Sequence, residues 1–269
     1  MIHKKQLLII LALACSLTCV TAAQEPIITK HKTSVKNKIK KTKKKPAVEG
    51  QLQSPIDLGK AFPVNLTDIK FNYNPVELSI TNLGHAVQVA PKAGQPSNSI
   101  VVDGKQYNLV QFHFHTPSEH SFKGRRFDME VHFVHKNAAG NLAVIGVLVQ
   151  KGERHKIYQK ILKMLPETEK ESADLGEPID LLALFPSDKR FYRYDGSLTT
   201  EPYSEGIKWF VIKQPIQMSQ DLIEKHKHIL HGPNSREEQA RNNRTVLFDC
   251  CSDDTIEQGL QEQNRAIAQ

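Results

Sequence analysis

A histidine-rich segment constrains the fold and the chemistry of this chain more than any other feature. It runs from Gln111 to His135, reads QFHFHTPSEHSFKGRRFDMEVHFVH and holds five of the chain's 12 histidines. His113 and His115 alternate with two phenylalanines. Because successive side chains of a strand point to opposite faces, this alternation predicts a strand that presents both imidazoles on one face. Two such ligands, two residues apart, suit a single metal ion.

A second alternating run extends from Phe127 to His135 and places Glu130, His132 and Val134 on one face. If this run lies antiparallel to the first, His132 reaches the same point as the other two histidines. Three neutral imidazoles leave one corner of a tetrahedron open, as in catalytic zinc sites, whereas a structural site takes a fourth protein ligand. Gln111 and Glu130 each precede a histidine by two residues and can accept its free ring N–H. The pattern is also compatible with histidines that are ordinary core residues.

Three short motifs in this segment resemble the zinc signature of the α-class carbonic anhydrases: QFHFH, SEH and ExHxVH. Other stretches match the same family in chain order: QSPI at 53–56, NLGHA at 82–86, LAVIG at 142–146, and SLTT at 197–200 followed by Trp209. The resemblance covers roughly residues 50–249. It implies a mainly β fold, with a large twisted, mostly antiparallel central sheet and short peripheral helices.

The resemblance also implies a reaction, the reversible hydration of carbon dioxide to bicarbonate and a proton by a zinc-bound hydroxide. His113, His115 and His132 are then the ligands of Zn2+. Thr199 accepts a hydrogen bond from the hydroxide and donates one to Glu119. The hydrogen bond between Thr199 and Glu119 must run in this direction, because an ionised carboxylate can only accept hydrogen bonds.

Further positions of the family's site carry over residue by residue. Thr200 lies where bicarbonate binds, and His85, in NLGHA, matches the proton shuttle, a role that suits a side chain titrating near neutral pH. The pocket for carbon dioxide corresponds to four apolar residues: Val134, Val144, Leu198 and Trp209. Without the resemblance, all these positions would be read as ordinary turn, strand or core residues.

The chain departs from the family ahead of QSPI, where members commonly carry an aromatic- and glycine-rich segment with a tyrosine that orders active-site water. Tyr203 stands where many bacterial members have a disulfide-bonded cysteine, so that disulfide is expected to be absent. The alternative function is that of a non-enzymatic, surface-binding relative that keeps the fold without zinc and adheres through its basic N-terminal arm. The presence of all three histidines argues against it.

Residues 1–23 have the features of a cleaved secretory signal: Lys4 and Lys5, an apolar run, and small residues up to Ala23. This predicts a secreted or periplasmic protein with no transmembrane segment after signal removal. The cysteines within the signal, Cys15 and Cys19, lie in poor contexts for acylation, so a lipoprotein is the less favoured interpretation.

Residues 24–47 are predicted to be a disordered spacer, because nine lysines crowd residues 30–45 without an acidic residue. Residues 1–45 carry a formal charge of +10 against +7 for the whole chain, so the remainder carries −3. We therefore expect no nucleic-acid partner for the catalytic domain. The basic arm can contact anionic surfaces, although a plain spacer is its more usual role.

The catalytic domain is predicted at residues 48–249 and a polar tail at 250–269, where the adjacent Cys250 and Cys251 are poorly placed to bridge each other. No phosphate-binding loop, nucleophile elbow or internal repeat is visible, and the sequence does not indicate the oligomeric state. Short strands are expected at 76–80, 85–90, 100–102, 107–115, 127–135, 142–150 and 207–213. Helices are expected at 154–165 and 219–230. In the second helix, the histidines at 226 and 228 are expected on an exposed face.

Overall fold

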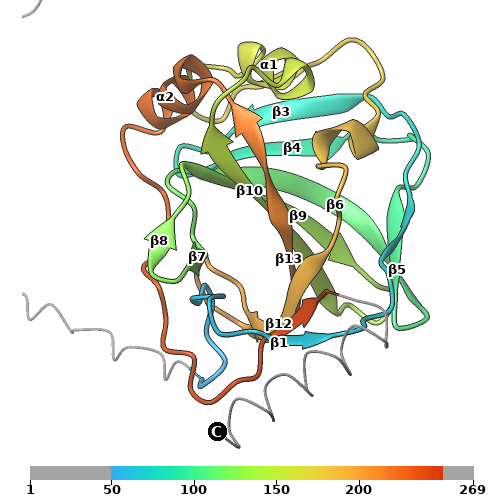
Figure 1. The fold of residues 1–269 in the computed structure, drawn as a ribbon. Helices are drawn as coiled ribbons and strands as arrows, with labels where there is room; N and C mark the ends of the chain where they lie inside the picture. Colours follow the sequence, from blue (N-terminus) through green and yellow to red (C-terminus); the bar gives the residue numbers. More distant parts are fainter. Residues whose placement is uncertain (1–49, 251–269) are drawn as a thin grey trace, which may run out of the picture. The chain divides into compact units, whose positions relative to one another are not determined.

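The computed structural model describes residues 50–250, which form a β-rich fold (Figure 1). Its strands are β1 (Phe62–Val64), β2 (Lys70–Asn72), β3 (Leu78–Asn82), β4 (Val87–Pro91), β5 (Ser99–Val102), β6 (Lys105–His115), β7 (Ser121–Phe122), β8 (Arg125–Arg126), β9 (Met129–Lys136), β10 (Leu142–Lys151), β11 (Ser172–Asp174), β12 (Phe191–Ser197), β13 (Glu205–Met218) and β14 (Leu247–Asp249). The helices are α1 (Lys156–Lys163), α2 (Gln220–Ile229) and the 3-10 helix η1 (Leu181–Leu184). The predicted signal, the lysine-rich spacer and Cys251 with the rest of the tail lie outside the described residues and stay predictions.

Twelve of the strands form one sheet, in the order β1-β14-β12-β13-β10-β9-β6-β4-β3-β11, with β2 and β5 attached through β6. Two pairs are parallel, β1 with β14 and β10 with β13, and the other pairs are antiparallel. The long strands β6, β9, β10 and β13 cross the middle of Figure 1. This confirms the predicted class, a large and mostly antiparallel sheet with short helices at its periphery.

Both faces of the sheet are covered by apolar residues. Along β10, Ile145 and Val147 belong to a core cluster on one face, whereas Val144 and Leu148 belong to a second cluster on the other. A strand buried on both faces needs a continuous apolar run rather than strict alternation. This requirement explains the unbroken sequence LAVIGVLV in the middle of the sheet.

The two helices are short and lie side by side near the top of Figure 1. Helix α1 buries Tyr158, Ile161 and Leu162, whose spacing of three and four residues places them on one helical face. The expected helices at 154–165 and 219–230 are both present and shorter by a few residues. None of the helices within residues 50–250 is long and apolar enough to cross a membrane.

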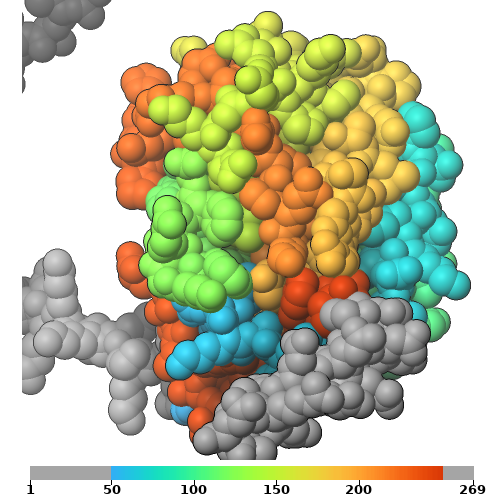
Figure 2. Space-filling model, viewed as in Figure 1, coloured from blue at the N-terminus to red at the C-terminus, as the bar shows by residue number. Residues whose placement is uncertain are grey.

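The ends of the described chain meet at one edge of the sheet. Phe62 pairs with Leu247 and Val64 with Asp249 in the β1–β14 ladder. Figure 2 shows the corresponding blue and red residues side by side in the lower part of that view. The sheet is therefore completed by segments nearly two hundred residues apart, which strand patterns alone do not predict.

Several strand boundaries differ from the prediction by one to a few residues, and one of the differences concerns a site residue. The predicted strand at 85–90 begins only at Val87, so His85 lies in the turn between β3 and β4. The turn is closed by the Leu83 amide, which donates to the carbonyl of Ala86 at 2.8 Å. Gly84, with φ of 80°, supplies the left-handed residue that such a turn needs.

The central aromatic packing yields a prediction for stability. Phe133 is fully buried, with its ring centroid 4.9 Å from that of Phe112 and 4.6 Å from that of Phe185. Phe133→Ala is expected to lower the free energy of unfolding by about 3–5 kcal/mol, because it leaves a cavity as well as losing burial. Phe62, 62% exposed, is the matched control, and Phe62→Ala should cost less than about 0.5 kcal/mol. Equal losses in urea unfolding would contradict this assignment of the core.

Candidate metal centre

The register of the sheet brings the predicted metal ligands into one row. His113 on β6 pairs with His132 on β9, and His132 pairs with Gly146 on β10. His115 lies two residues beyond His113 on the same face. Gly146 is required here, because a Cβ at this position would lie 2.7 Å from Oε1 of Glu130. The small residue in LAVIG thus makes room for the carboxylate that supports His132.

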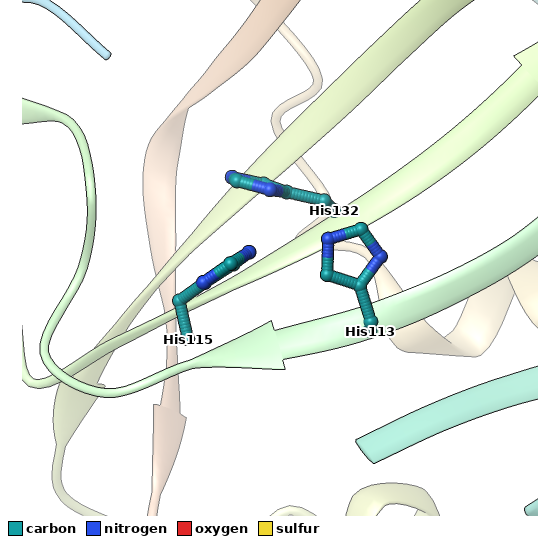
Figure 3. A group of neighbouring side chains, drawn as sticks. All are labelled: His113, His115 and His132. Atoms are coloured by element: carbon teal, nitrogen blue, oxygen red, sulfur yellow. The ribbon is translucent and has the colours of Figure 1, made fainter. Parts of the chain in front are cut away.

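The three imidazoles converge on one point. One ring nitrogen from each of His113, His115 and His132 lies within 4.8 Å of the others. Figure 3 shows the rings turned toward one another, two of them from one strand and the third from its neighbour. His115 and His132 are buried, and His113 is partly exposed. The sequence-predicted ligands are therefore brought together by the fold.

Each histidine has a polar neighbour at one ring nitrogen, which is a hydrogen-bond partner for His113 and His115 and an ion-pair contact for His132. Nδ1 of His113 donates to Oε1 of Gln111 at 2.9 Å. Nδ1 of His115 donates to the carbonyl of Asn234 at 3.2 Å, and its buried Nε2 has no hydrogen-bond partner among the described residues. Nε2 of His132 lies 3.0 Å from Oε1 of Glu130. Outer partners of this kind fix the tautomer and ring orientation of metal-bound histidines.

The electrostatics favour neutral imidazoles at two of the three positions. Burial lowers the pKa of His113 well below its usual range, and the neighbouring histidines add to the effect. Burial also lowers the pKa of His115, against the opposing influence of Glu119. For His132, burial opposes the charged form, but Glu130 outweighs it and raises the pKa. Metal binding requires the neutral form of His132 and would therefore compete with the proton that Glu130 favours.

The donor set fits zinc. The three imidazole nitrogens match the three-ligand pattern of a catalytic site with an open fourth position. One of them, Nε2 of His115, is buried and has no hydrogen-bond partner among the described residues. A second group, His120 with Glu130 and His132, has suitable spacing as well. Both nitrogens of His120 are already engaged, Nδ1 with Oε1 of Glu130 and Nε2 with the hydroxyl of Tyr194, each at 2.7 Å. That group is a hydrogen-bonded support and not a second metal site.

A cavity of ≈ 570 Å³ opens beside the histidines. Its lining includes His85, Thr199 and Thr200, together with two of the ligands, His113 and His115. The predicted shuttle and threonines thus face the same space as the metal site. His85 is exposed, as a residue that exchanges protons with solvent must be.

Glu119 lies buried next to the ligands. Its Oε1 accepts a hydrogen bond from the backbone amide of Arg236 at 2.8 Å and lies 3.4 Å from Nδ1 of His115. Its Oε2 is buried and has no hydrogen-bond partner among the described residues. The predicted hydrogen bond from Thr199 to this carboxylate is therefore not formed in the structure, although the oxygen it would reach is available.

The four apolar residues predicted to receive carbon dioxide belong to one cluster. Val134, Val144 and Trp209 lie in a row across β9, β10 and β13, one step along from the row of the ligands. The indole ring of Trp209 contacts the imidazole of His132, with 4.8 Å between centroids. These residues, together with the half-buried Leu198, flank the metal site and are not part of the cavity lining itself.

Comparison with known proteins identifies the family. The sequence pattern of the family described as eukaryotic-type carbonic anhydrase matches residues 36–249. The chain belongs to the α-carbonic anhydrase family. A carbonic anhydrase of Klebsiella pneumoniae is 37% identical over 198 residues, which cover 74% of this chain and 80% of that protein. Family members are zinc lyases, which agrees with the donor set described above.

Solved α-carbonic anhydrases share the fold. A hyperthermostable carbonic anhydrase from an active hydrothermal vent chimney superposes with a TM-score of 0.71 and 41% identity, covering 74% of this chain and 88% of that one. The enzyme of Thermovibrio ammonificans, solved with the inhibitor sulfanilamide, gives a TM-score of 0.70 and 37% identity, covering 74% and 87%. The resemblance seen in the sequence motifs is thereby confirmed.

One histidine of this carbonic anhydrase lies where the helical pattern did not place it. His226 was expected on an exposed face of α2, but it is fully buried and packs against Phe114, with 5.7 Å between ring centroids. Its Nδ1 makes a 2.8 Å hydrogen bond with the hydroxyl of Thr116. Burial lowers the pKa of His226 to about 3. The prediction failed because the lysines on either side of His226 suggested an exposed helical face, although His226 itself faces inward.

The first prediction for the site concerns its metal content. The protein should bind about one zinc per chain, and His115→Ala should lose nearly all of it, because two imidazoles are one short of the three protein ligands that hold a catalytic zinc. Zinc is measured by elemental analysis after dialysis. His231→Ala, an exposed histidine outside the cavity, is the control and should retain parental zinc. Full zinc in the His115 variant would contradict the ligand assignment.

The second prediction follows from the titration of His226. Its folded pKa of about 3 lies below the unfolded value near 6.5, so the unfolded chain binds more protons between these pH values. The stabilising effect of the neutral ring is present above about pH 6.5 and is lost as the pH falls toward 3. Between pH 6.5 and 5 this amounts to about 2 kcal/mol. His226→Phe should reduce the pH dependence of urea unfolding by that amount, and an unchanged dependence would contradict the assignment.

Proposed function

We propose that this α-carbonic anhydrase catalyses the reversible hydration of carbon dioxide to bicarbonate and a proton. The observation that carries the proposal is the three-imidazole site with an open position beside a cavity that also contains Thr199. Zinc held by His113, His115 and His132 would lower the pKa of a water ligand to about 7, a value known from carbonic anhydrases themselves, and so supply hydroxide at neutral pH. The protein residues around the site perform the remaining tasks.

The proposal is tested by stopped-flow measurement of carbon dioxide hydration with the zinc-loaded protein. The parent should exceed the His115→Ala variant by several orders of magnitude. A protein that holds zinc stoichiometrically but hydrates carbon dioxide no faster than this variant would contradict the proposal. Absence of zinc from the isolated protein, together with absence of activity, would instead favour the non-enzymatic alternative, in which the fold serves surface binding.

Orientation of the nucleophile is assigned to Glu119 and Thr199. Glu119 can only accept hydrogen bonds while ionised, and one of its buried oxygens is available. A threonine hydroxyl that donates to this oxygen must in turn accept the hydrogen of the nucleophile. The lone pair of the nucleophile then points toward the substrate, with Thr200 nearby at the product position.

The substrate needs an apolar surface, because carbon dioxide is apolar and binds poorly among hydrogen-bonding groups. The cluster of Val134, Val144, Leu198 and Trp209 provides that surface next to His132.

The relay between Glu119 and Thr199 predicts non-additive losses. Glu119→Gln and Thr199→Ala should each lower kcat/KM for carbon dioxide by about 10²-fold, because each removes the same oriented hydrogen bond. The double variant should be little worse than either single variant, as for residues that act as one unit. Stopped-flow kinetics on the zinc-replete variants measure this cycle. Losses that multiply would show that the two residues act independently.

His85 is proposed to carry the proton from the site to solvent, since it is exposed and lines the same cavity as His113. His85→Ala should lower kcat about tenfold in dilute buffer and leave kcat/KM nearly unchanged, because proton release follows hydration as a separate step. Added imidazole should restore most of the lost kcat. His228→Ala, exposed on α2 away from the cavity, is the matched control. A parental kcat for the His85 variant in dilute buffer would assign proton transfer to another route.

A further inference from the structure

Tyr203 has an unusual backbone conformation at the rim of the cavity. Its φ is 59°, in the left-handed region that large side chains rarely adopt. Its amide donates to the carbonyl of Thr200 at 2.9 Å, and its own carbonyl accepts from Nε2 of Gln53 at 3.2 Å. Strain of this kind persists only where surrounding contacts hold it, and it tends to occur at functional sites.

The ring of Tyr203 packs against the guanidinium group of Arg236. The guanidinium carbon of Arg236 lies 3.7 Å from the centroid of the Tyr203 ring. Nη1 of the same guanidinium donates to Oε1 of Gln53 at 2.9 Å and to the carbonyl of Ser54 at 2.7 Å. The arginine side chain is therefore fixed on one side by the QSPI segment and on the other by the tyrosine ring.

The backbone of Arg236 contacts the proposed catalytic machinery directly. Its amide donates to Oε1 of Glu119 at 2.8 Å. On the other side of the stack, the loop from Leu198 to Ser204 carries both threonines and is closed by the Leu198 amide, which donates to the carbonyl of Ser204 at 2.9 Å. The stack thus joins the segment that holds Glu119 to the loop that holds Thr199.

We propose that Tyr203 is a positioning residue, whose ring clamps Arg236 and thereby sets the Thr199–Thr200 loop against Glu119. The inference rests on the proposed function and specifies how Glu119 and Thr199 are held in position relative to each other. Tyr203 and Arg236 both line the cavity together with Thr199 and Thr200, so the clamp lies within the site it supports. An aromatic ring at this position is needed for its face, and the hydroxyl is not required.

Three substitutions distinguish the effect of the Tyr203 ring from the effect of its backbone conformation. Tyr203→Phe keeps the stacking face, Tyr203→Leu replaces it with an aliphatic side chain, and Tyr203→Gly removes the side chain while relieving the left-handed backbone. Phe248→Leu is the matched control, because it removes another ring that stacks with a cation, Lys213 at 4.6 Å, away from the cavity. Each protein is measured for zinc content, thermal unfolding midpoint, kcat/KM for carbon dioxide, and amide hydrogen exchange at Arg236.

The Leu and Gly variants should lose about tenfold or more in kcat/KM, with zinc content unchanged, and the Arg236 amide should exchange faster. The Gly variant is the most informative, because relief of backbone strain should keep its unfolding midpoint near that of the parent. The Phe variant should retain most of kcat/KM and parental exchange. The Phe248→Leu control should leave kcat/KM and exchange at Arg236 unchanged.

Parental kcat/KM and parental exchange at Arg236 in the Leu and Gly variants would overturn the clamp. A loss of kcat/KM that tracks the unfolding midpoint across all variants would also overturn it, since a purely structural role would then suffice. If the zinc-loaded parent does not hydrate carbon dioxide, the proposed function fails. Hydrogen exchange at the Arg236 amide is then the test of the clamp, because it reports the hydrogen bond to Glu119 whether or not the protein is an active enzyme.

Discussion

The site depends on one buried carboxylate, that of Glu130. Its Oε2 accepts the backbone amides of Glu119 and His120, each at 2.9 Å, and its Oε1 contacts His120 at 2.7 Å and His132 at 3.0 Å. Burial alone would raise the pKa of Glu130, but His120 and His132 together hold it well below its usual range. An ionised group buried so completely is tolerated only when it is fully paired. The same contacts orient His132, the third proposed metal ligand, and place Glu119 beside it.

The support behind Glu130 extends outward through hydrogen bonds that cross the fold. His120 contacts the hydroxyl of Tyr194, which in turn donates to Oγ of Ser54 at 2.8 Å. Ser54 belongs to the QSPI segment, far from both residues in the chain. The network ties the metal centre to the N-terminal segment of the domain, so the site and the fold are stabilised by the same contacts.

The C-terminal segment completes the site from the other side. Asn234 accepts from His115 through its carbonyl and from the Thr116 amide through Oδ1, at 3.2 and 2.9 Å. Its Nδ2 donates to the carbonyl of Phe114 at 2.8 Å and that of His85 at 3.4 Å. Asn234 thereby links a proposed metal ligand, through its backbone carbonyl, to the turn that carries the proposed shuttle, through its side chain. Arg236, two residues further along this segment, contacts Glu119 through its backbone amide.

Much of this arrangement was predictable from local patterns, because side chains alternate strictly along a strand. That rule placed His113 and His115 on one face, and it brought His132 to them on the condition that the two strands pair. Gln111 and Glu130 are in phase with these histidines, and the structure has this arrangement. The family motifs added Glu119, Thr199 and His85, which a single alternation pattern does not distinguish from turn or strand residues.

Other features depend on contacts between segments distant in the chain and carry no local signal. The short strands β1 and β14 pair only because the two ends of the domain meet, and His120 looks like an ordinary loop residue until Tyr194 and Glu130 surround it. His226 was misplaced because burial is set by what packs against a helix and not by the charges beside the residue. The stack of Tyr203 on Arg236 likewise joins residues 33 positions apart, each unremarkable in its own stretch of sequence. Strand periodicity therefore specifies which side chains share a face, whereas the packing of distant segments decides which of them meet.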